Sequence, residues 1–542
     1  MSIIVNGNEM EYKAGLTAID LVKPFSKDVV SCKIDGKLRD LNYSIEDGNT
    51  VDLLGLDDED STRVYEAALR YLVAMGVKRA YPTMKVNCDY YIARSICFNK
   101  SNGEAFNEEE FENIKSKVKE IVEADYTFIR KNISKDEASE YYKNNGFEDK
   151  VDVFHYRKSD TVHIYICDDY VNYTYSYMVP STSYLSKYNL ILYKGKIVLQ
   201  YPRADKGGEI PGFHSENTYE EMLVISEKWA KELGALTVSD INKNILEDSA
   251  GFIQKCEDRH SMLIKKLGDK IEEKGNIKLI AIAGPSSSGK TTFSNKLRAE
   301  LESRGIYPVK ISMDDYYLDR SDLSPEEEKN IDYEDVNLLD IELFNQHLKE
   351  LAEGKEVTLP KFNFLTKKRE VGSTIKLGQN EPIIIEGIHA LNEMLTKSLP
   401  RENKFEIYIG PHIQINIDNH TPISMTHLRL IRRMVRDYLF RGSDVSRTLG
   451  MWDSVRRGEF KWIYDNQEGV DFVYNSVLNY EFCVMKKYAI PLLQKVDKNS
   501  SYYNLSKTLI KYLKYFVDIQ DDDIPENSLL REFIGGSCFK EH

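Results

Sequence analysis

Several things are scarce in this 542-residue sequence, and each scarcity narrows the classes of protein it can belong to. The seven cysteines are scattered and include no C-x-x-C pair, so we expect reduced thiols and no disulfide framework. No apolar run approaches the roughly 18 residues of a membrane helix, and the first residues lack a cationic stretch followed by an apolar one. We therefore expect neither a membrane span nor a signal peptide, and a cytoplasmic location.

Positive charge is also in deficit. The 73 lysines and arginines are outnumbered by 87 acidic residues, which leaves a formal net charge of −14. This balance argues against non-specific binding to nucleic acid or to anionic membranes, although it leaves room for a local basic site. Apolar residues make up 42% and aromatic residues 11% of the chain, enough for well-packed cores, and the length suggests about three domains.

Residues 1–58 have the pattern of a small α/β unit. An Asn6-Gly7 turn joins two short strands, residues 18–22 are predicted to form a short amphipathic helix, and a second hairpin over 30–41 turns at Asp35-Gly36. A last strand follows over 50–54. This order is typical of a β-grasp fold, and the acidic run 57–60 after it is interpreted as a solvated linker.

In pattern and length this unit resembles the TGS domain that opens threonyl-tRNA synthetases. The resemblance implies an effector nucleotide or RNA as a partner at this domain. Residues 1–60 hold 13 acidic and 6 basic side chains, the wrong balance for binding a phosphate backbone. A docking or stabilising module is the alternative.

Residues 60–235 resemble the second accessory, or editing, domain of threonyl- and alanyl-tRNA synthetases. The amphipathic helix over 62–82 is similar to the family's opening helix, but Ala67 and Tyr71 occupy the positions of its histidine pair. The stretch YTYSYMVPST is similar to the family's Cys-x-x-x-His segment, with Thr174 and Met178 at the ligand positions. The resemblance implies a degenerate editing domain that binds no zinc. A connecting helix is expected over 236–275.

The stretch GPSSSGKT matches the phosphate-loop pattern G-x-x-x-x-G-K-[ST] at every fixed position. A buried-strand pattern over 279–283 precedes it, and helical periodicity over 292–303 follows. Such a loop turns backbone N–H groups toward phosphate oxygens, Lys290 reaches the β and γ phosphates, and the Thr291 hydroxyl binds Mg²⁺. The predicted ATP contacts are Gly284, Pro285, Ser286, Ser287, Ser288, Gly289, Lys290, Thr291 and Thr292.

Two further strand patterns lead into carboxylates. A strand predicted over 307–313 is followed by Asp314, and one predicted over 381–385 is followed by Glu386. In an open parallel sheet, ligands gather at the carboxyl ends of the strands, so Lys290, Asp314 and Glu386 should meet there. One carboxylate can accept a proton from an attacking hydroxyl and the other can hold Mg²⁺. Taken singly, each could be an acidic helix cap.

A helical segment over 426–441 is rich in arginine. Because guanidinium groups suit phosphate oxygens and the charge of a transferring phosphoryl group, we interpret this helix as a lid over ATP. A solvated basic face is the alternative. Its arginines are Arg429, Arg432, Arg433, Arg436 and, just beyond it, Arg441.

Residues 276 to about 497 resemble the uridine kinase and phosphoribulokinase family through the motifs GPSSSGKTT, SMDDYY, IDYEDVNLLD, IIIEGIHAL and RRMVRD. The resemblance implies an α/β P-loop kinase domain with a mostly parallel sheet over 276–520. It leaves 521–542 as a tail with one short helix. The whole chain is thus predicted to be an α/β multidomain protein with an N-terminal β-grasp, a middle α+β editing-like domain and a C-terminal kinase.

By motif, the resemblance implies that Asp314 is the general base and that Lys290 and Arg436 complete the catalytic set. It places Tyr317 and Asp332 on the nucleoside, Arg433 on the substrate, and Arg436 and Arg441 on ATP. Within PKFNFLTKKR, this sequence has Phe362 and Lys367 where the family reads the pyrimidine base with Tyr and His. Phenylalanine can stack but cannot hydrogen-bond, so the preferred base stays open.

Three functions follow from these patterns. The first is a Mg·ATP-dependent kinase that phosphorylates the 5′-hydroxyl of a nucleoside. The second is a sugar-phosphate kinase, in which the cations of Lys367-Lys368-Arg369 would bind the acceptor's own phosphate. The third is a nucleotide-sensing or RNA-linked regulator whose output is the front half of the chain. A homo-oligomer is compatible with all three.

Overall fold

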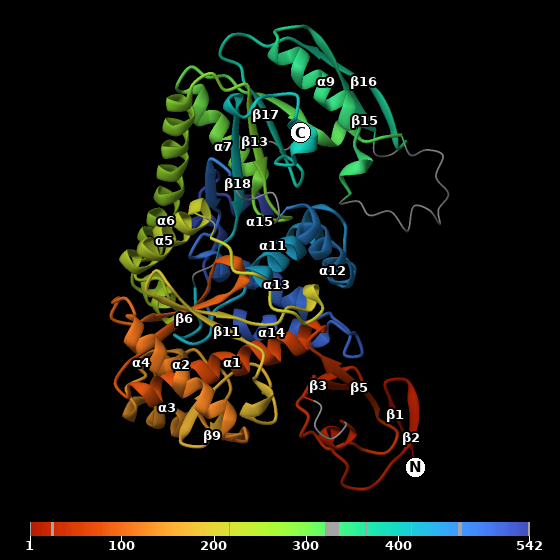
Figure 1. The fold of residues 1–542 in the computed structure, drawn as a ribbon. Coiled ribbons are helices and arrows are strands. Elements are labelled where there is room, and N and C mark those ends of the chain that lie inside the picture. The colour runs from red at the N-terminus through yellow and green to blue at the C-terminus, as the bar shows by residue number, and fades with distance from the viewer. Residues whose placement is uncertain are drawn as a thin grey trace.

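The computed structural model describes residues 2–22, 27–215, 217–319, 335–363, 366–412, 415–463 and 469–539. A front sheet, a middle α+β region and a parallel sheet with covering helices follow one another along the chain (Figure 1). Among the helices of these residues, none combines the length and apolarity that a bilayer crossing requires. The α/β multidomain class predicted from the sequence is confirmed.

The front unit is a five-stranded sheet in the order β2-β1-β5-β3-β4. Its two hairpins turn at Asn6-Gly7 and Asp35-Gly36, all four residues with positive φ, as tight turns between strands require. A 3₁₀ turn, Ala18–Leu21, lies between them. The strands are β1 (Ser2–Val5), β2 (Asn8–Glu11), β3 (Val29–Ile34), β4 (Lys37–Arg39) and β5 (Thr50–Gly55).

The acidic run after this sheet is not the solvated linker that the sequence suggested. Helix α1 (Glu59–Ala80) begins within it, because the Asp58 carboxylate accepts hydrogen bonds from the backbone N–H groups of Asp60 and Ser61. The acidic run therefore caps the N-terminus of α1. Most residues of this helix are buried, and it packs in the core of the middle region.

The middle region packs helices on two antiparallel sheets, ordered β10-β9-β8 and β11-β12-β7-β6. Its strands are β6 (Val86–Tyr90), β7 (Ile96–Lys100), β8 (Ile129–Ser134), β9 (Thr161–Cys167), β10 (Tyr170–Tyr173), β11 (Asn189–Tyr193) and β12 (Lys196–Gln200). Its helices are α1, α2 (Glu108–Glu123), α3 (Lys135–Asn144), α4 (Glu148–His155) and α5 (Asn217–Leu233). Helix α6 (Val238–Lys274) then runs to the C-terminal part.

The C-terminal part is built on five parallel strands in the order β14-β17-β13-β18-β19. These strands are β13 (Leu279–Ala283), β14 (Val309–Ser312), β17 (Ile383–Gly387), β18 (Lys404–Gly410) and β19 (Phe472–Asn475). The hairpin of β15 (Val357–Asn363) and β16 (Lys368–Ile375) projects with α9 (Ile341–Ala352) at the opposite end of the molecule from the front sheet (Figure 1). The other helices are α7 (Lys290–Glu302), α10 (Glu393–Thr396), α11 (Met425–Phe440), α12 (Val445–Trp462), α13 (Glu481–Leu493), α14 (Tyr503–Leu513) and α15 (Arg531–Ile534).

The middle region and the C-terminal part share one hydrophobic core. Tyr142, Phe154 and Tyr173 belong to the same buried cluster as residues of β13, β18, α11 and α13. The loop between β18 and α11 reaches into the middle region, where Asp418 lies against Lys150. The two predicted domains are therefore interlocked, and their division at 235 stays a prediction.

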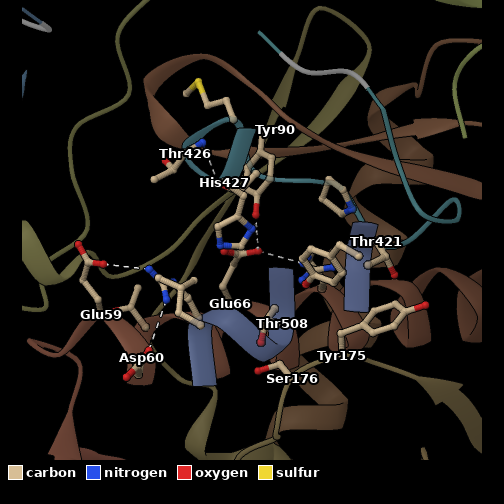
Figure 2. Close-up of a pocket in the computed structure, with 18 of the residues that line it drawn as sticks. Glu59, Asp60, Glu66, Tyr90, Tyr175, Ser176, Thr421, Thr426, His427 and Thr508 are labelled. Atoms are coloured by element: carbon tan, nitrogen blue, oxygen red, sulfur yellow. Dashed lines mark hydrogen bonds and ion pairs between the residues drawn. The ribbon is translucent and has the colours of Figure 1, made fainter. Parts of the chain in front are cut away.

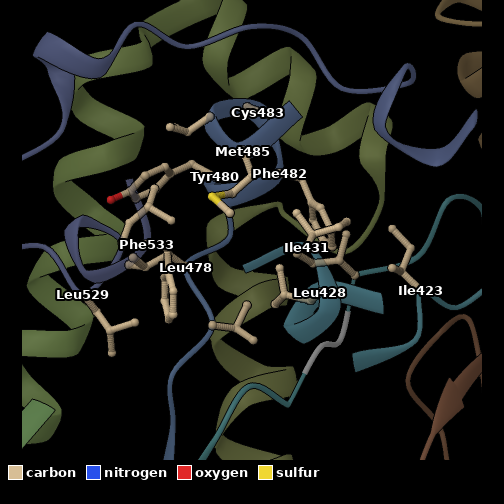
Figure 3. Close-up of a cluster of buried hydrophobic side chains, with 14 of the residues drawn as sticks. Ile423, Leu428, Ile431, Leu478, Tyr480, Phe482, Cys483, Met485, Leu529 and Phe533 are labelled. Atoms are coloured by element: carbon tan, nitrogen blue, oxygen red, sulfur yellow. The ribbon is translucent and has the colours of Figure 1, made fainter. Parts of the chain in front are cut away.

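The last residues of the described chain are packed, although the sequence suggested a tail. Figure 3 shows Leu529 and Phe533 beside Leu478 and Tyr480, near the α11 residues Leu428 and Ile431. Leu529, Leu530 and Phe533 are each at most 1% exposed. This segment thus completes the core beneath the phosphate loop.

Candidate active site

The phosphate loop joins the central strand β13 to helix α7 in the arrangement that the motif predicts. Gly289 caps α7 with a φ of 92°, which a side chain would strain, and a Cβ at Gly284 would lie 2.0 Å from the Ile409 carbonyl oxygen. The Lys290 ammonium folds back and donates to the carbonyl oxygens of Gly284 (2.8 Å) and Pro285 (3.1 Å). Burial lowers the pKa of Lys290 to about 8, although the neighbouring carboxylates of Glu386 and Glu532 oppose this shift.

Both predicted carboxylates lie at the carboxyl edge of the sheet. Asp314 lies in the turn that follows β14, and Glu386 is a residue of β17 itself, one position inside the strand rather than after it. The Glu386 carboxylate accepts a hydrogen bond from Lys310 at 2.6 Å. Loss of solvent contact and the charges of Asp315 and Glu386 raise the pKa of Asp314 above its ordinary value. A raised pKa favours proton acceptance near neutral pH.

The chemistry of this edge fits a hard cation. The second carboxylate oxygen of Glu386 and the hydroxyls of Ser287 and Ser288 are buried without a hydrogen-bond partner among the described residues. Within the same residues, no group of three His, Cys, Asp or Glu side chains lies close enough to hold a metal ion. Mg²⁺ commonly takes one or two protein oxygens and completes its shell with phosphate and water. Thr291 and Glu386 supply oxygens of this kind, and their role as Mg²⁺ ligands stays a prediction.

Two of the five predicted arginines contact the back of the loop and are not part of a lid. Arg429 pairs with Glu459 and donates to the Ser286 carbonyl oxygen at 3.1 Å. Arg432 makes two hydrogen bonds to Glu481, at 2.7 and 3.0 Å. Both side chains are at most 1% exposed, so they hold the loop from within the core.

The remaining arginines converge on one carboxylate. Asp437 lies 3.3 Å from Arg433, 2.8 Å from Arg436 and 3.8 Å from Arg441, which follows the last residue of α11. Arg433 also donates to the Ser286 hydroxyl at 2.9 Å. Arg436 lies near enough to Lys290 and Glu532 to influence the pKa of each. The predicted roles of these three arginines toward ATP and substrate stay predictions.

The predicted acceptor residues fall in two places. Tyr317 follows Asp314, and its ring centroid lies 5.7 Å from that of Phe362 on β15. The Phe362 N–H donates to Asp315 at 3.1 Å, which ties the hairpin to the turn that carries Asp314. Lys367 lies at the hairpin turn with a φ of 57°. Asp332 lies outside the described residues.

One contact at the loop was missed from the sequence. The Glu532 carboxylate accepts a hydrogen bond from the Thr292 N–H at 3.0 Å, at the N-terminus of α7 where phosphate oxygens bind in such loops. Burial raises the pKa of Glu532, although Thr292 and the charges of Lys290 and Arg436 oppose the rise. No local motif signals this contact, because 240 positions separate the two residues.

The positions that match editing-domain ligands lie inside the middle region. Ala67 and Tyr71 are buried on α1, and the Tyr71 hydroxyl donates to the carbonyl oxygens of Tyr165 and Tyr170 at 3.0 and 2.7 Å. Met178 is 1% exposed, and the Thr174 hydroxyl accepts from the Ser176 N–H at 3.2 Å. Tyr71 and Met178 therefore serve the packing of this region.

Together, the parallel sheet, the phosphate loop on its central strand and the carboxylates at its edge define a P-loop phosphotransferase fold. The Phosphoribulokinase / Uridine kinase family matches residues 279–478. A uridine kinase from Proteus mirabilis is 31% identical over 198 residues, which are 36% of this chain and 85% of that kinase. The chain belongs to the phosphoribulokinase/uridine kinase family.

A second likeness covers the N-terminal region. A threonine–tRNA ligase from Syntrophomonas wolfei is 26% identical over 161 residues, which are 29% of this chain and 25% of the ligase. The chain thus spans about a quarter of the length of that relative. Among solved structures, a possible uridine kinase from Bacillus stearothermophilus is 19% identical and covers 40% of this chain and 100% of its own, with a TM-score of 0.24.

Proposed function

We propose that this protein transfers the γ-phosphoryl group of Mg·ATP to the 5′-hydroxyl of a nucleoside. The observation that carries the proposal is the gathering of Lys290, Asp314 and Glu386 at one edge of a parallel sheet, around a phosphate loop of the kinase family. A protein that only sensed a nucleotide would not need a carboxylate beside the γ-phosphate.

The proton and bond changes follow from this placement. Asp314 accepts the proton of the acceptor hydroxyl as its oxygen bonds to the γ-phosphorus, the bond from that phosphorus to the β–γ bridging oxygen breaks, and ADP leaves. Lys290 and Arg436 stabilise the charge on the phosphate oxygens. Thr291 and Glu386 would hold Mg²⁺, which neutralises phosphate charge when bound.

An aromatic pair beside Asp314 favours an acceptor with a planar ring. Tyr317 and Phe362 present neighbouring rings next to the catalytic turn. The sugar-phosphate alternative needs free cations at the hairpin, but Arg369 donates to Asp340 at 2.7 Å. This pairing reduces the positive charge available for an acceptor phosphate and favours the nucleoside.

The test is ADP release from Mg·ATP with uridine, cytidine, adenosine, guanosine, inosine, thymidine and ribulose 5-phosphate in separate assays. We expect turnover with at least one nucleoside. Asp314→Asn should reduce kcat about 100-fold or more, the usual contribution of a general base, while binding of a non-hydrolysable ATP analogue persists. The exposed Asp522→Asn variant is the matched control. Turnover with ribulose 5-phosphate alone, or an active Asp314→Asn enzyme, would overturn the proposal.

A further inference from the structure

A large cavity lies away from the phosphate loop, between the front and middle regions and the C-terminal helices. Its volume is about 1320 Å³, above the usual range of roughly 300–1,000 Å³ for small-molecule sites. Helix α14 passes along it, and Figure 2 shows Thr508 of this helix close to Tyr175 and Ser176 of the middle region. Segments hundreds of residues apart in sequence therefore build its wall.

The cavity lining is cationic in a protein that is acidic as a whole. Eight arginines and five lysines line it, against four carboxylates. Those carboxylates are already paired with arginines of the same wall: Glu59 and Asp60 with Arg63, Glu66 with Arg70, and Asp205 with Arg94 and Arg203. A large excess of positive charge is left facing the cavity.

Part of this excess is concentrated in a cation cluster, which we define as Arg130, Arg157, Lys507 and Lys511. Arg130 comes from β8, Arg157 from the segment after α4, and the two lysines from α14. Among the described residues, no member forms an ion pair with a carboxylate within 4.0 Å, although Arg130 lies near enough to Asp40 for its charge to oppose the rise that burial causes in the pKa of Asp40. Burial and the charges of Arg157, Arg130 and Lys507 lower the pKa of Lys511 to about 8. Four like charges at one place favour an anionic ligand.

Tyrosine rings lie against the same cluster. Lys511 lies 4.5 Å from the ring centroid of Tyr175, and Arg130 lies 5.1 Å from that of Tyr177. Arg157 donates to the Tyr515 hydroxyl at 3.0 Å. The site therefore offers cations for phosphate and aromatic faces for a planar ring within one enclosure.

We propose that this cavity binds a free nucleotide that carries two or more phosphate groups. The phosphates lie at the cation cluster and the base packs among the tyrosines. A free nucleotide is favoured over an RNA strand because the chain's net charge of −14 repels a long polyanion, whereas a short anion can lie wholly against the cationic lining of the cavity. This proposal does not depend on which acceptor the kinase site uses.

The experiment uses the full chain with the phosphate loop saturated by Mg²⁺ and a non-hydrolysable ATP analogue. Calorimetry then follows a second binding event with nucleoside di-, tri- and tetraphosphates, inorganic tripolyphosphate and a 12-nucleotide single-stranded RNA. We expect at least one of these nucleotides to bind with a stoichiometry near one molecule per protein chain. Tripolyphosphate should bind at least tenfold more weakly, because it lacks the ring.

Charge variants assign the binding to the cluster. Lys511→Glu and, separately, Arg130→Glu should weaken nucleotide binding at least tenfold, and Lys511→Gln should weaken it less. Lys119→Glu, a charge reversal on an exposed lysine of α2 outside the cavity, should leave it unchanged. Thermal melting of each variant checks its folding. The proposal fails if no nucleotide binds up to 1 mM, if Lys511→Glu and Arg130→Glu fold and bind like the parent, or if RNA binds at least tenfold more tightly than every nucleotide.

Discussion

The ion pair between Lys150 and Asp418 joins the middle region to the C-terminal part, and we expect its loss to lower the free energy of unfolding. The two side chains are 1% and 0% exposed, and the Lys150 ammonium lies 2.8 Å from a carboxylate oxygen of Asp418. Removing one partner of such a buried pair leaves a buried charge uncompensated and costs about 3–5 kcal/mol. We expect Lys150→Met to lower the free energy of unfolding by that amount at pH 7.

The pH dependence follows from the carboxylate. Burial by itself would raise the pKa of Asp418, but the charge and hydrogen bond of Lys150, with a hydrogen bond from Tyr173, hold it well below the ordinary value. A depressed folded-state pKa stabilises the protein above about pH 4, and this stabilisation is lost as the pH falls further. Without Lys150, burial prevails and the pKa of Asp418 rises. The stability deficit of Lys150→Met should therefore be greatest at pH 7 and shrink toward pH 4.

Urea unfolding of both proteins at pH 7 and pH 4 measures this. Lys115→Met is the control, because Lys115 forms an exposed pair with Glu112 whose loss should cost about 1 kcal/mol or less. The double variant Lys150→Met, Asp418→Asn should recover much of the loss, since it also removes the buried charge of Asp418. A deficit below about 1 kcal/mol at pH 7, or one that is the same at both pH values, would refute this reasoning.

Three further predictions concern the phosphate loop and the acceptor site. Glu532→Gln removes a negative charge from the N-terminus of α7, so the KM for Mg·ATP should fall about two- to tenfold in steady-state assays; a higher KM would contradict this. Gly289→Ala places a Cβ 2.5 Å from Leu529 at a strained φ, so kcat/KM should fall at least about tenfold with little change in circular dichroism, and a fully active variant would count against the described loop. Phe362→Ala should raise the nucleoside KM by a factor that corresponds to a loss of about 1–3 kcal/mol of binding free energy, whereas Phe362→Tyr should retain most of the affinity. If both variants raised the KM equally, a contact between this ring and the nucleoside would be excluded.

Features set by neighbouring residues could be predicted from the sequence, and features set by distant ones could not. The loop between β13 and α7 was predictable because its glycines and Lys290 act within a few residues of one another. The sequence predicts the start of α1 too late, because an aspartate such as Asp58 is as common in a solvated linker as at a helix cap. The contacts of Asp418 with Lys150 and of Glu532 with Thr292 join residues 268 and 240 positions apart, and a single sequence carries no signal for such pairings.

The arrangement around Glu532 has a consequence for how the protein is made and handled. Thr292 and Gly289 of the phosphate loop receive contacts from Glu532 and Leu529, and 240 positions separate Thr292 from Glu532. During translation these contacts can therefore form only after residues 529–532 have left the ribosome. An affinity tag fused close after this segment would lie beside the residues that contact the loop, so kinetic work on this protein is better served by a tag placed far from it.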